Sequence, residues 1–174
     1  LLDFGAATVN VFPNAGPADF GDYAGYSIAT STQPGAKLRL GDLDGDGDLD
    51  AVVGTRDANQ TLLNGGNATF TDTGQDIGRS PSRKVAIGDI DQDGDLDVLS
   101  GNPDNPDYLW LNDGNASFTA AGQQLGGYNS RGIEFGDVDG DGDLDLVIVH
   151  RDAGNQIWLN DGGANFSLHQ YLYV

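Results

Sequence analysis

A nine-residue acidic segment occurs three times in this chain, and its spacing constrains the fold more than any other feature of the sequence. The copies read D-x-D-x-D-G-D-x-D and cover residues 42–50, 89–97 and 137–145. Their first residues, Asp42, Asp89 and Asp137, lie 47 and 48 residues apart. A fixed period of this length is typical of repeat architectures, in which one supersecondary unit recurs along the chain.

Strand-like patterns surround each acidic segment at matching positions. An alternating apolar stretch precedes it, a β-branched run follows it, and a third apolar stretch leads through a Gly-rich turn to Phe70, Phe118 or Phe166. No segment has a sustained helical period. The sequence therefore predicts an all-β fold, a β-propeller of four-stranded antiparallel blades with the acidic loop between the first and second strands.

The repeat divides the chain into one partial and three full units. Residues 1–37 read as a partial, degenerate blade, and residues 38–84, 85–132 and 133–174 each read as a blade with an acidic loop. The chain thus holds about 3.5 blades, whereas closed propellers have about four or more. We expect a longer chain or a homo-oligomer to supply further blades, and a chain that begins without Met inside a blade favours the longer chain.

The acidic loops predict three structural calcium sites. Fifteen of the 27 acidic residues lie in these loops, and the net charge of the chain is −19. Clustered carboxylates repel one another unless a cation lies among them, and hard oxygen ligands favour Ca²⁺ over Mg²⁺, which needs a tight octahedron. We assign side-chain ligands to positions 1, 3, 5 and 9 and the backbone carbonyl to position 7. The candidate metal-binding residues are Asp42, Asp44, Asp46, Asp48, Asp50, Asp89, Asp91, Asp93, Asp95, Asp97, Asp137, Asp139, Asp141, Asp143 and Asp145.

Two alternatives to this assignment are less consistent with the sequence. An EF-hand requires a bidentate Glu at position 12, where this chain has Val53, Ser100 and Ile148. A solvated Asp-rich turn would explain one loop more readily than three matched loops at a fixed period.

With these loops and the downstream N-D-G-N-x-S/T-F pattern, residues 38–174 resemble the FG-GAP/VCBS repeats of integrin-α-type β-propellers. The segment Gly25–Ala29 is similar to the start of an FG-GAP motif. The resemblance implies calcium ligands at Asp42, Asp44, Asp46, Asp50 and their counterparts, and an extracellular or cell-surface location. Families of this type include integrin heads, lectins and accessory domains of secreted enzymes.

Composition argues against several other functions. The negative charge disfavours nucleic acid and anionic membrane surfaces, and no apolar run approaches the roughly 18 residues of a membrane-inserted span. The two histidines, His150 and His169, belong to no acid–base constellation, so we expect no enzyme activity. Trp110 and Trp158 share one repeat position that is apolar in every copy, which favours interblade core over a sugar-stacking role.

The loops opposite the acidic segments are the better candidates for recognition. Because strands alternate in direction, the second–third loops and the blade connectors share the end away from the acidic loops. Their sequences differ between copies, as recognition loops on a rigid scaffold often do, although any one residue there also fits an ordinary solvated loop. The candidate ligand-binding residues are Arg56, Asp57, Asp104, Tyr108, Tyr128, Arg131, Arg151 and Asp152.

These observations favour an extracellular, calcium-stabilised module that binds carbohydrate or protein, of the lectin or adhesion type. Two alternatives stay open. One is an accessory propeller of a secreted carbohydrate-active enzyme, and the other is a self-assembling surface or filament subunit.

Overall fold

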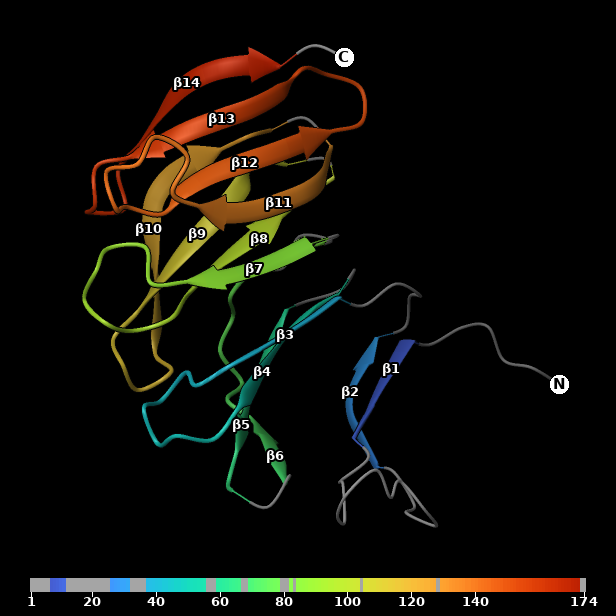
Figure 1. The fold of residues 1–174 in the computed structure, drawn as a ribbon. Coiled ribbons are helices and arrows are strands. Elements are labelled where there is room, and N and C mark those ends of the chain that lie inside the picture. The colour runs from blue at the N-terminus through green and yellow to red at the C-terminus, as the bar shows by residue number, and fades with distance from the viewer. Residues whose placement is uncertain are drawn as a thin grey trace, which may run out of the picture.

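The computed structural model describes residues 7–11, 26–31, 37–55, 59–66, 69–78, 82, 84–103, 105–127 and 129–172. Within these ranges all regular secondary structure is β, in fourteen strands (Figure 1). The all-β prediction is therefore confirmed for the described residues. Among them, no helix has the length and apolar character needed to cross a membrane.

Twelve of the strands form three four-stranded antiparallel sheets, each in chain order. The first sheet contains β3 (Lys37–Gly41), β4 (Asp50–Gly54), β5 (Gln60–Asn64) and β6 (Phe70–Asp72). The second contains β7 (Lys84–Gly88), β8 (Asp97–Gly101), β9 (Asp107–Asn112) and β10 (Phe118–Leu125). The third contains β11 (Ser130–Gly136), β12 (Asp145–His150), β13 (Asn155–Asn160) and β14 (Phe166–Leu172). Each sheet is blade-like, as predicted. A separate antiparallel pair precedes them, β1 (Ala7–Val11) and β2 (Tyr26–Ser31).

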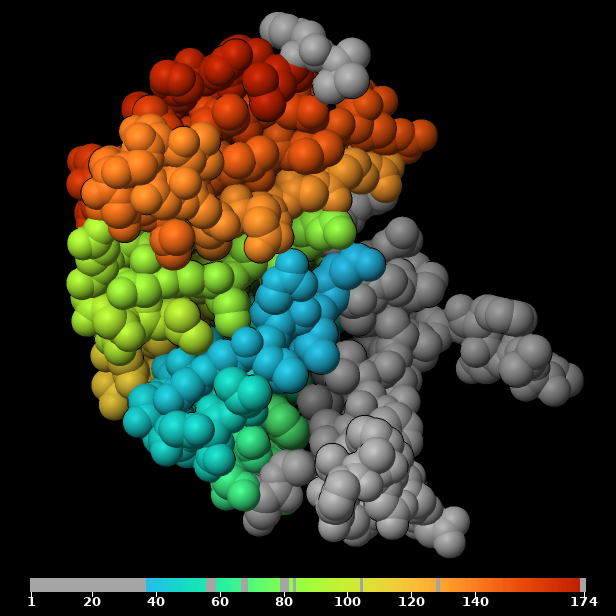
Figure 2. Space-filling view, in the orientation of Figure 1, coloured from blue at the N-terminus to red at the C-terminus, as the bar shows by residue number. Residues whose placement is uncertain are grey.

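The sheets pack face to face in chain order, as the succession of colours from cyan to red shows in Figure 2. The second strands are central and apolar on both faces, and every residue of β4 and β8 is buried. In β4, Val52 faces the second sheet, whereas Ala51 and Val53 belong to a cluster on the other side. Successive side chains of a strand point to opposite faces, so one short apolar run contributes to two layers of core.

The hydrophobic core lies between the sheets. One cluster joins the first and second sheets through Leu43, Val52, Val85 and Val98, with Trp110 packed against it. A larger cluster joins the second and third sheets, and Trp158 packs against that one. Both tryptophans therefore occupy the interblade core, as their repeat position predicts.

The two ends of the strands differ in character. The acidic loops between first and second strands lie at the same end as the hairpins between third and fourth strands. In the second sheet, for example, Asp95 Oδ2 of the acidic loop lies 2.5 Å from the position that a Cβ of Gly114 in the hairpin would occupy. We call this the acidic end. The loops between second and third strands and the sheet connectors lie at the opposite end, where the Ser130 amide donates to Asn102 O at 3.2 Å. We call this the connector end.

Candidate metal centres and connector-end loops

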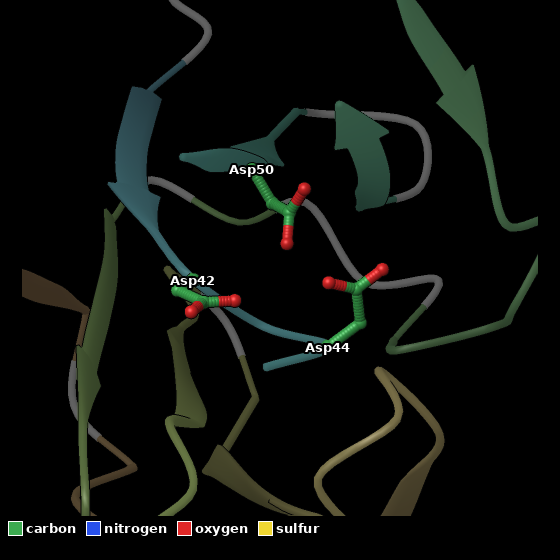
Figure 3. Close-up of side chains that lie close together, drawn as sticks. All are labelled: Asp42, Asp44 and Asp50. Atoms are coloured by element: carbon green, nitrogen blue, oxygen red, sulfur yellow. The ribbon is translucent and has the colours of Figure 1, made fainter. Parts of the chain in front are cut away.

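Each acidic loop brings three carboxylates together. These are the residues at positions 1, 3 and 9: Asp42, Asp44 and Asp50 in the first loop, Asp89, Asp91 and Asp97 in the second, and Asp137, Asp139 and Asp145 in the third. Within each set, one carboxylate oxygen per residue lies within 4.8 Å of the others. Figure 3 shows Asp42, Asp44 and Asp50 directed toward a shared space. This donor set, all hard oxygen, matches the ligands that Ca²⁺ takes in proteins.

The aspartate at position 9 closes the loop as well as joining the triad. Asp50 is completely buried, and its carboxylate accepts the Leu43 amide at 2.8 Å and the Asn64 amide at 2.8 Å. Asp97 and Asp145 are also fully buried and accept amides from the same two repeat positions. Position 9 therefore ties the start of the loop to the end of the third strand in every sheet.

The aspartate at position 1 organises the turn. Asp42 accepts the amides of Gly45 at 2.8 Å and Gly47 at 3.0 Å. Gly47 has φ +91°, a left-handed conformation that glycine adopts without steric cost. In the third loop Asp137 accepts the equivalent amides of Gly140 and Gly142.

The second loop departs from this pattern at position 4. Gln92 replaces the glycine there, with φ 62°, and its side-chain amide donates to Asp143 of the third loop. Asp89 Oδ1 and Asp91 Oδ1 are buried and have no hydrogen-bond partner. A buried oxygen without a partner is costly, and a divalent cation bound by the triad would satisfy both atoms. The residues of this loop therefore fit a calcium ion.

Burial and charge both act on the loop carboxylates. Desolvation raises the pKa of Asp97 to about 6, against the lowering effect of the amides of Asn112 and Ile90. Desolvation is also the largest cause of the raised pKa of Asp44, Asp91 and Asp139, and the charges of neighbouring loop aspartates raise it further. A cation among these groups would favour their ionised forms.

The aspartates at positions 5 and 7 lie outside the three triads. At position 5, Asp46, Asp93 and Asp141 are exposed, and each accepts the amide of position 7 at 2.9–3.0 Å. At position 7, the carboxylates of Asp48, Asp95 and Asp143 lie against the hairpin glycines Gly66, Gly114 and Gly162. Metal ligation by positions 5 and 7 stays a prediction.

Two sets of amide side chains connect adjacent sheets, and the sequence analysis missed both. Asn112 Nδ2 donates to Leu43 O at 2.8 Å, and Asn160 Nδ2 donates to Ile90 O at 2.8 Å. Each acceptor is position 2 of the preceding sheet's acidic loop. The available signal was the recurrence of Asn as the last residue of the third strand, at Asn64, Asn112 and Asn160.

The second set comes from the fourth strands and connectors. Gln123 donates to Phe166 O at 2.5 Å and accepts the Phe166 amide at 2.9 Å. Gln75 makes a similar pair of bonds to the second sheet, accepting the Phe118 amide at 2.9 Å but donating to the carbonyl of Ala116, two residues earlier. Each glutamine therefore holds the hairpin of the next sheet by its backbone.

Four of the eight candidate ligand-binding residues lie in the described part of the connector end. Arg151 and Asp152 line a hollow of about 610 Å³ with His150, Asn155 and Leu172. Arg131 lies in β11 at an irregularity of the pairing with β12. Tyr108 is half-buried in β9 and does not line this hollow. Arg56, Asp57, Asp104 and Tyr128 lie outside the described residues.

Asp107 is a buried acid at the connector end that the sequence analysis did not single out. Its carboxylate accepts the Asn102 amide and the Ser130 hydroxyl, each at 2.7 Å. Desolvation nevertheless raises its pKa to about 6, although both hydrogen bonds lower it. These contacts hold the start of β9 in the second sheet against the start of β11 in the third sheet, which is a structural role.

Comparison with known proteins identifies a family and a similar fold. The model of the FG-GAP-like repeat matches residues 42–100 and 89–148, together more than half of the chain. A solved structure of a lectin from Agrocybe aegerita, described as recognising non-reducing terminal N-acetylglucosamine, is similar with a TM-score of 0.56 and 23% identity. The match covers 83% of this chain and 42% of the lectin chain, so this chain spans about two fifths of that protein. At this identity the likeness establishes the fold alone. No curated protein matches the chain.

Proposed function

This chain belongs to the FG-GAP-like repeat family, and on that premise we propose that it is a calcium-stabilised recognition module that binds carbohydrate or protein outside the cell. We assign it recognition rather than catalysis. The observation that carries the proposal is the division of the molecule into an acidic end with three repeated carboxylate triads and a connector end with a large hollow.

Calcium has a structural role in this proposal. The triads join residues before and after the turn of each loop, and the buried oxygens of Asp89 and Asp91 have no other partner. An ion there would fix the conformation of the loop. It would thereby also fix the position 2 carbonyl, which accepts a hydrogen bond from an asparagine side chain of the next sheet. Millimolar calcium outside cells suits loops of this kind, which bind with Kd on the order of 10⁻⁵ to 10⁻³ M.

We place the ligand at the connector end. Arg151 and Asp152 lie in the loop between β12 and β13 and line the hollow, and Leu172 gives the hollow an apolar side. A hollow of about 610 Å³ with a few polar groups at its edge is within the range of roughly 300–1,000 Å³ that small-molecule sites occupy. The fold shared with an N-acetylglucosamine-recognising lectin makes carbohydrate the first ligand to test.

Further blades are the second kind of partner that we propose. Position 2 of the loop is buried in the first two sheets, with Leu43 2% and Ile90 0% exposed, because the next sheet covers it. The equivalent Val138 in the third sheet is 48% exposed. A neighbouring blade, from a longer chain or from another copy, would cover it in the same way. Sedimentation equilibrium of the 174-residue chain tests this, and a stable, cooperatively folded monomer would contradict it.

A glycan array in millimolar calcium tests carbohydrate recognition. We expect selective binding that Arg151→Ala weakens by about tenfold or more, in line with the loss of one hydrogen bond to a charged group. Lys37→Ala is the matched control, because Lys37 is an exposed cation at the same end that does not line the hollow. Binding that both variants leave unchanged would contradict the placement of the site. No binding of any glycan would contradict the carbohydrate form of the proposal.

A further inference from the structure

The buried aspartates at position 9 belong to one series of hydrogen bonds that runs through all three acidic loops. In the first loop, Asp50 accepts the Leu43 amide at 2.8 Å. Leu43 O accepts Asn112 Nδ2 at 2.8 Å, and the Asn112 amide donates to Asp97 Oδ1 at 2.9 Å. The Ala116 amide also donates to Leu43 O, at 3.0 Å, but it belongs to the hairpin and leads to no triad member. Asn112 therefore joins the triads of two adjacent sheets.

The same series continues from the second loop to the third. Asp97 Oδ2 accepts the Ile90 amide at 2.9 Å, and Ile90 O accepts Asn160 Nδ2 at 2.8 Å. The Asn160 amide then donates to Asp145 Oδ1 at 2.9 Å. The same three bonds at both contacts between sheets show that this link is part of the repeat.

The two linking asparagines are held in the interior of the molecule. Asn112 and Asn160 are each 5% exposed. Each Nδ2 also donates to a position 8 carbonyl of its own sheet, Leu96 O or Leu144 O, at 3.2 Å. Asn112 Oδ1 is buried without a hydrogen-bond partner, so the donors of this side chain fix its place. Hydrogen bonds away from water are stronger than exposed ones, and solvent does not replace one that is lost.

Each link connects groups that move with the triads. Leu43 lies between Asp42 and Asp44, two members of the first triad, so its carbonyl is fixed when these two carboxylates are held together. The Asn112 amide holds Asp97, a member of the second triad. Ordering the first loop therefore also orders a ligand of the second loop.

We propose that Asn112 and Asn160 are positioning residues that make calcium binding by neighbouring loops positively cooperative. The inference rests on the proposed function, in which the three triads hold calcium, and adds a coupling between them. The first loop to become ordered bears the entropy cost of fixing the shared asparagine, and the next loop is then ordered at a smaller cost. Coupling of binding free energies is reciprocal, so each site raises the affinity of the other by the same factor.

Electrostatics opposes this coupling. A divalent ion in one loop reduces the negative potential that attracts an ion to the next. Salt limits this effect, because the Debye length is about 8 Å at an ionic strength of about 0.15 M, whereas buried interactions are screened much less. Each loop also has five aspartates, so it stays negative with one ion bound.

Calcium titrations of the first two loops, followed by NMR in about 0.15 M salt, test the proposal. The amides of Gly47 and Gly94 report on these loops, because each donates to the position 1 carboxylate of its own triad. With the first site removed by Asp44→Ala, we expect the affinity of the second loop to fall about five- to tenfold, at the lower end of the range for coupled sites. Asp91→Ala should lower the affinity of the first loop by the same factor. These loops are chosen because Gln92 adds a second contact between the second and third loops.

Three variants assign the coupling to the asparagine. In an Asn112→Ala background, Asp44→Ala should no longer change the affinity of the second loop. Asn64→Ala is the matched control and should retain the coupling, because Asn64 Nδ2 donates to Leu49 O of its own sheet. Val85→Ala removes buried apolar packing between the same two sheets at the connector end. It should lower the thermal unfolding midpoint and still retain the coupling.

The outcomes separate this inference from the proposed function. Independent binding by the first two loops of the wild-type chain, which is measured without Asn112→Ala, overturns the inference and leaves the structural calcium sites in place. Coupling that survives Asn112→Ala, or that Val85→Ala abolishes equally, overturns the positioning role. Failure of every loop to bind calcium removes the structural role of calcium together with this inference.

Discussion

The side chain of Asn112 gives the sharpest test of how the sheets are joined. It donates to Leu43 O of the preceding sheet at 2.8 Å and to Leu96 O of its own sheet at 3.2 Å, and it is 5% exposed. Asn112→Ala removes both donors but leaves the backbone bond to Asp97 in place. Each net hydrogen bond contributes about 0.5–1.5 kcal/mol, so we expect a loss of about 1–3 kcal/mol in the free energy of unfolding.

Asn64 is the matched control within the chain. It occupies the same repeat position in the first sheet, and its amide donates to Leu49 O at 3.2 Å in an exposed setting. Among the described residues it contacts no preceding-sheet carbonyl. Water replaces exposed bonds of this kind, so Asn64→Ala should cost less than about 1 kcal/mol.

Urea unfolding in millimolar calcium, followed by tryptophan fluorescence and by circular dichroism, measures the difference between the two variants. A loss of about 2 kcal/mol corresponds to a lowering of Tm by about 4–8 °C for a chain of this size. Equal losses for Asn64→Ala and Asn112→Ala would refute the reasoning, because the interblade bond would then contribute nothing beyond the turn.

Three further predictions follow from single positions. Gly114→Ala should lower stability by about 1–2 kcal/mol in urea unfolding, because Gly114 has φ +79° and a Cβ there would lie 2.5 Å from Asp95 Oδ2; an unchanged midpoint would contradict this. The pKa of Asp107 is raised to about 6 from 3.8, so the folded state holds its proton more tightly than the unfolded state, and stability falls as pH rises between these values. Wild type should lose about 1 kcal/mol relative to Asp107→Asn between pH 5 and 7, and parallel pH profiles would contradict the raised pKa. The variants Asp44→Ala, Asp91→Ala and Asp139→Ala each replace the position 3 aspartate of one loop, and each should lose about one equivalent of bound calcium, measured by calorimetry. Full calcium binding by all three variants would show that the ligand register is wrong.

The strands and the loop positions were predictable from the sequence because they depend on local patterns repeated three times. The β-branched runs after the acidic loops form central strands of the sheets. In two of these strands, β4 and β8, every residue is buried. The period-2 pattern and the turn residues indicate where each strand begins and ends, and both can be read within a few neighbouring residues. The position of Trp110 in the interblade core followed from the apolar character of one repeat position.

The roles of individual polar side chains were less predictable because their partners lie far away in the chain. Asn112 and Leu43 are 69 residues apart, and Asn160 and Ile90 are 70 apart. The sequence predicts the aspartate at position 9 as a metal ligand, but it does not indicate that Asp50, Asp97 and Asp145 are completely buried and accept two backbone amides each. Such long-range bonds depend on how the sheets stack, which no local pattern encodes.

Gln92 shows the same limit within a loop. Its position is glycine in the other two loops, so the sequence marks it as an exception without indicating a consequence. In the structure its side chain contacts Asp143 of the next sheet's loop, and two buried oxygens of the same loop, on Asp89 and Asp91, have no hydrogen-bond partner. The second loop is therefore the one whose carboxylates most need a cation.

The thermal unfolding midpoint in chelator and in millimolar calcium tests the central claim most directly. A ligand that binds only the folded state stabilises it by about 2.7 kcal/mol per site at a hundredfold excess over Kd. With three triads, each able to hold one ion, we predict that calcium raises Tm by well over 5 °C. The same midpoint in both conditions would contradict the assignment of the acidic loops as structural calcium sites.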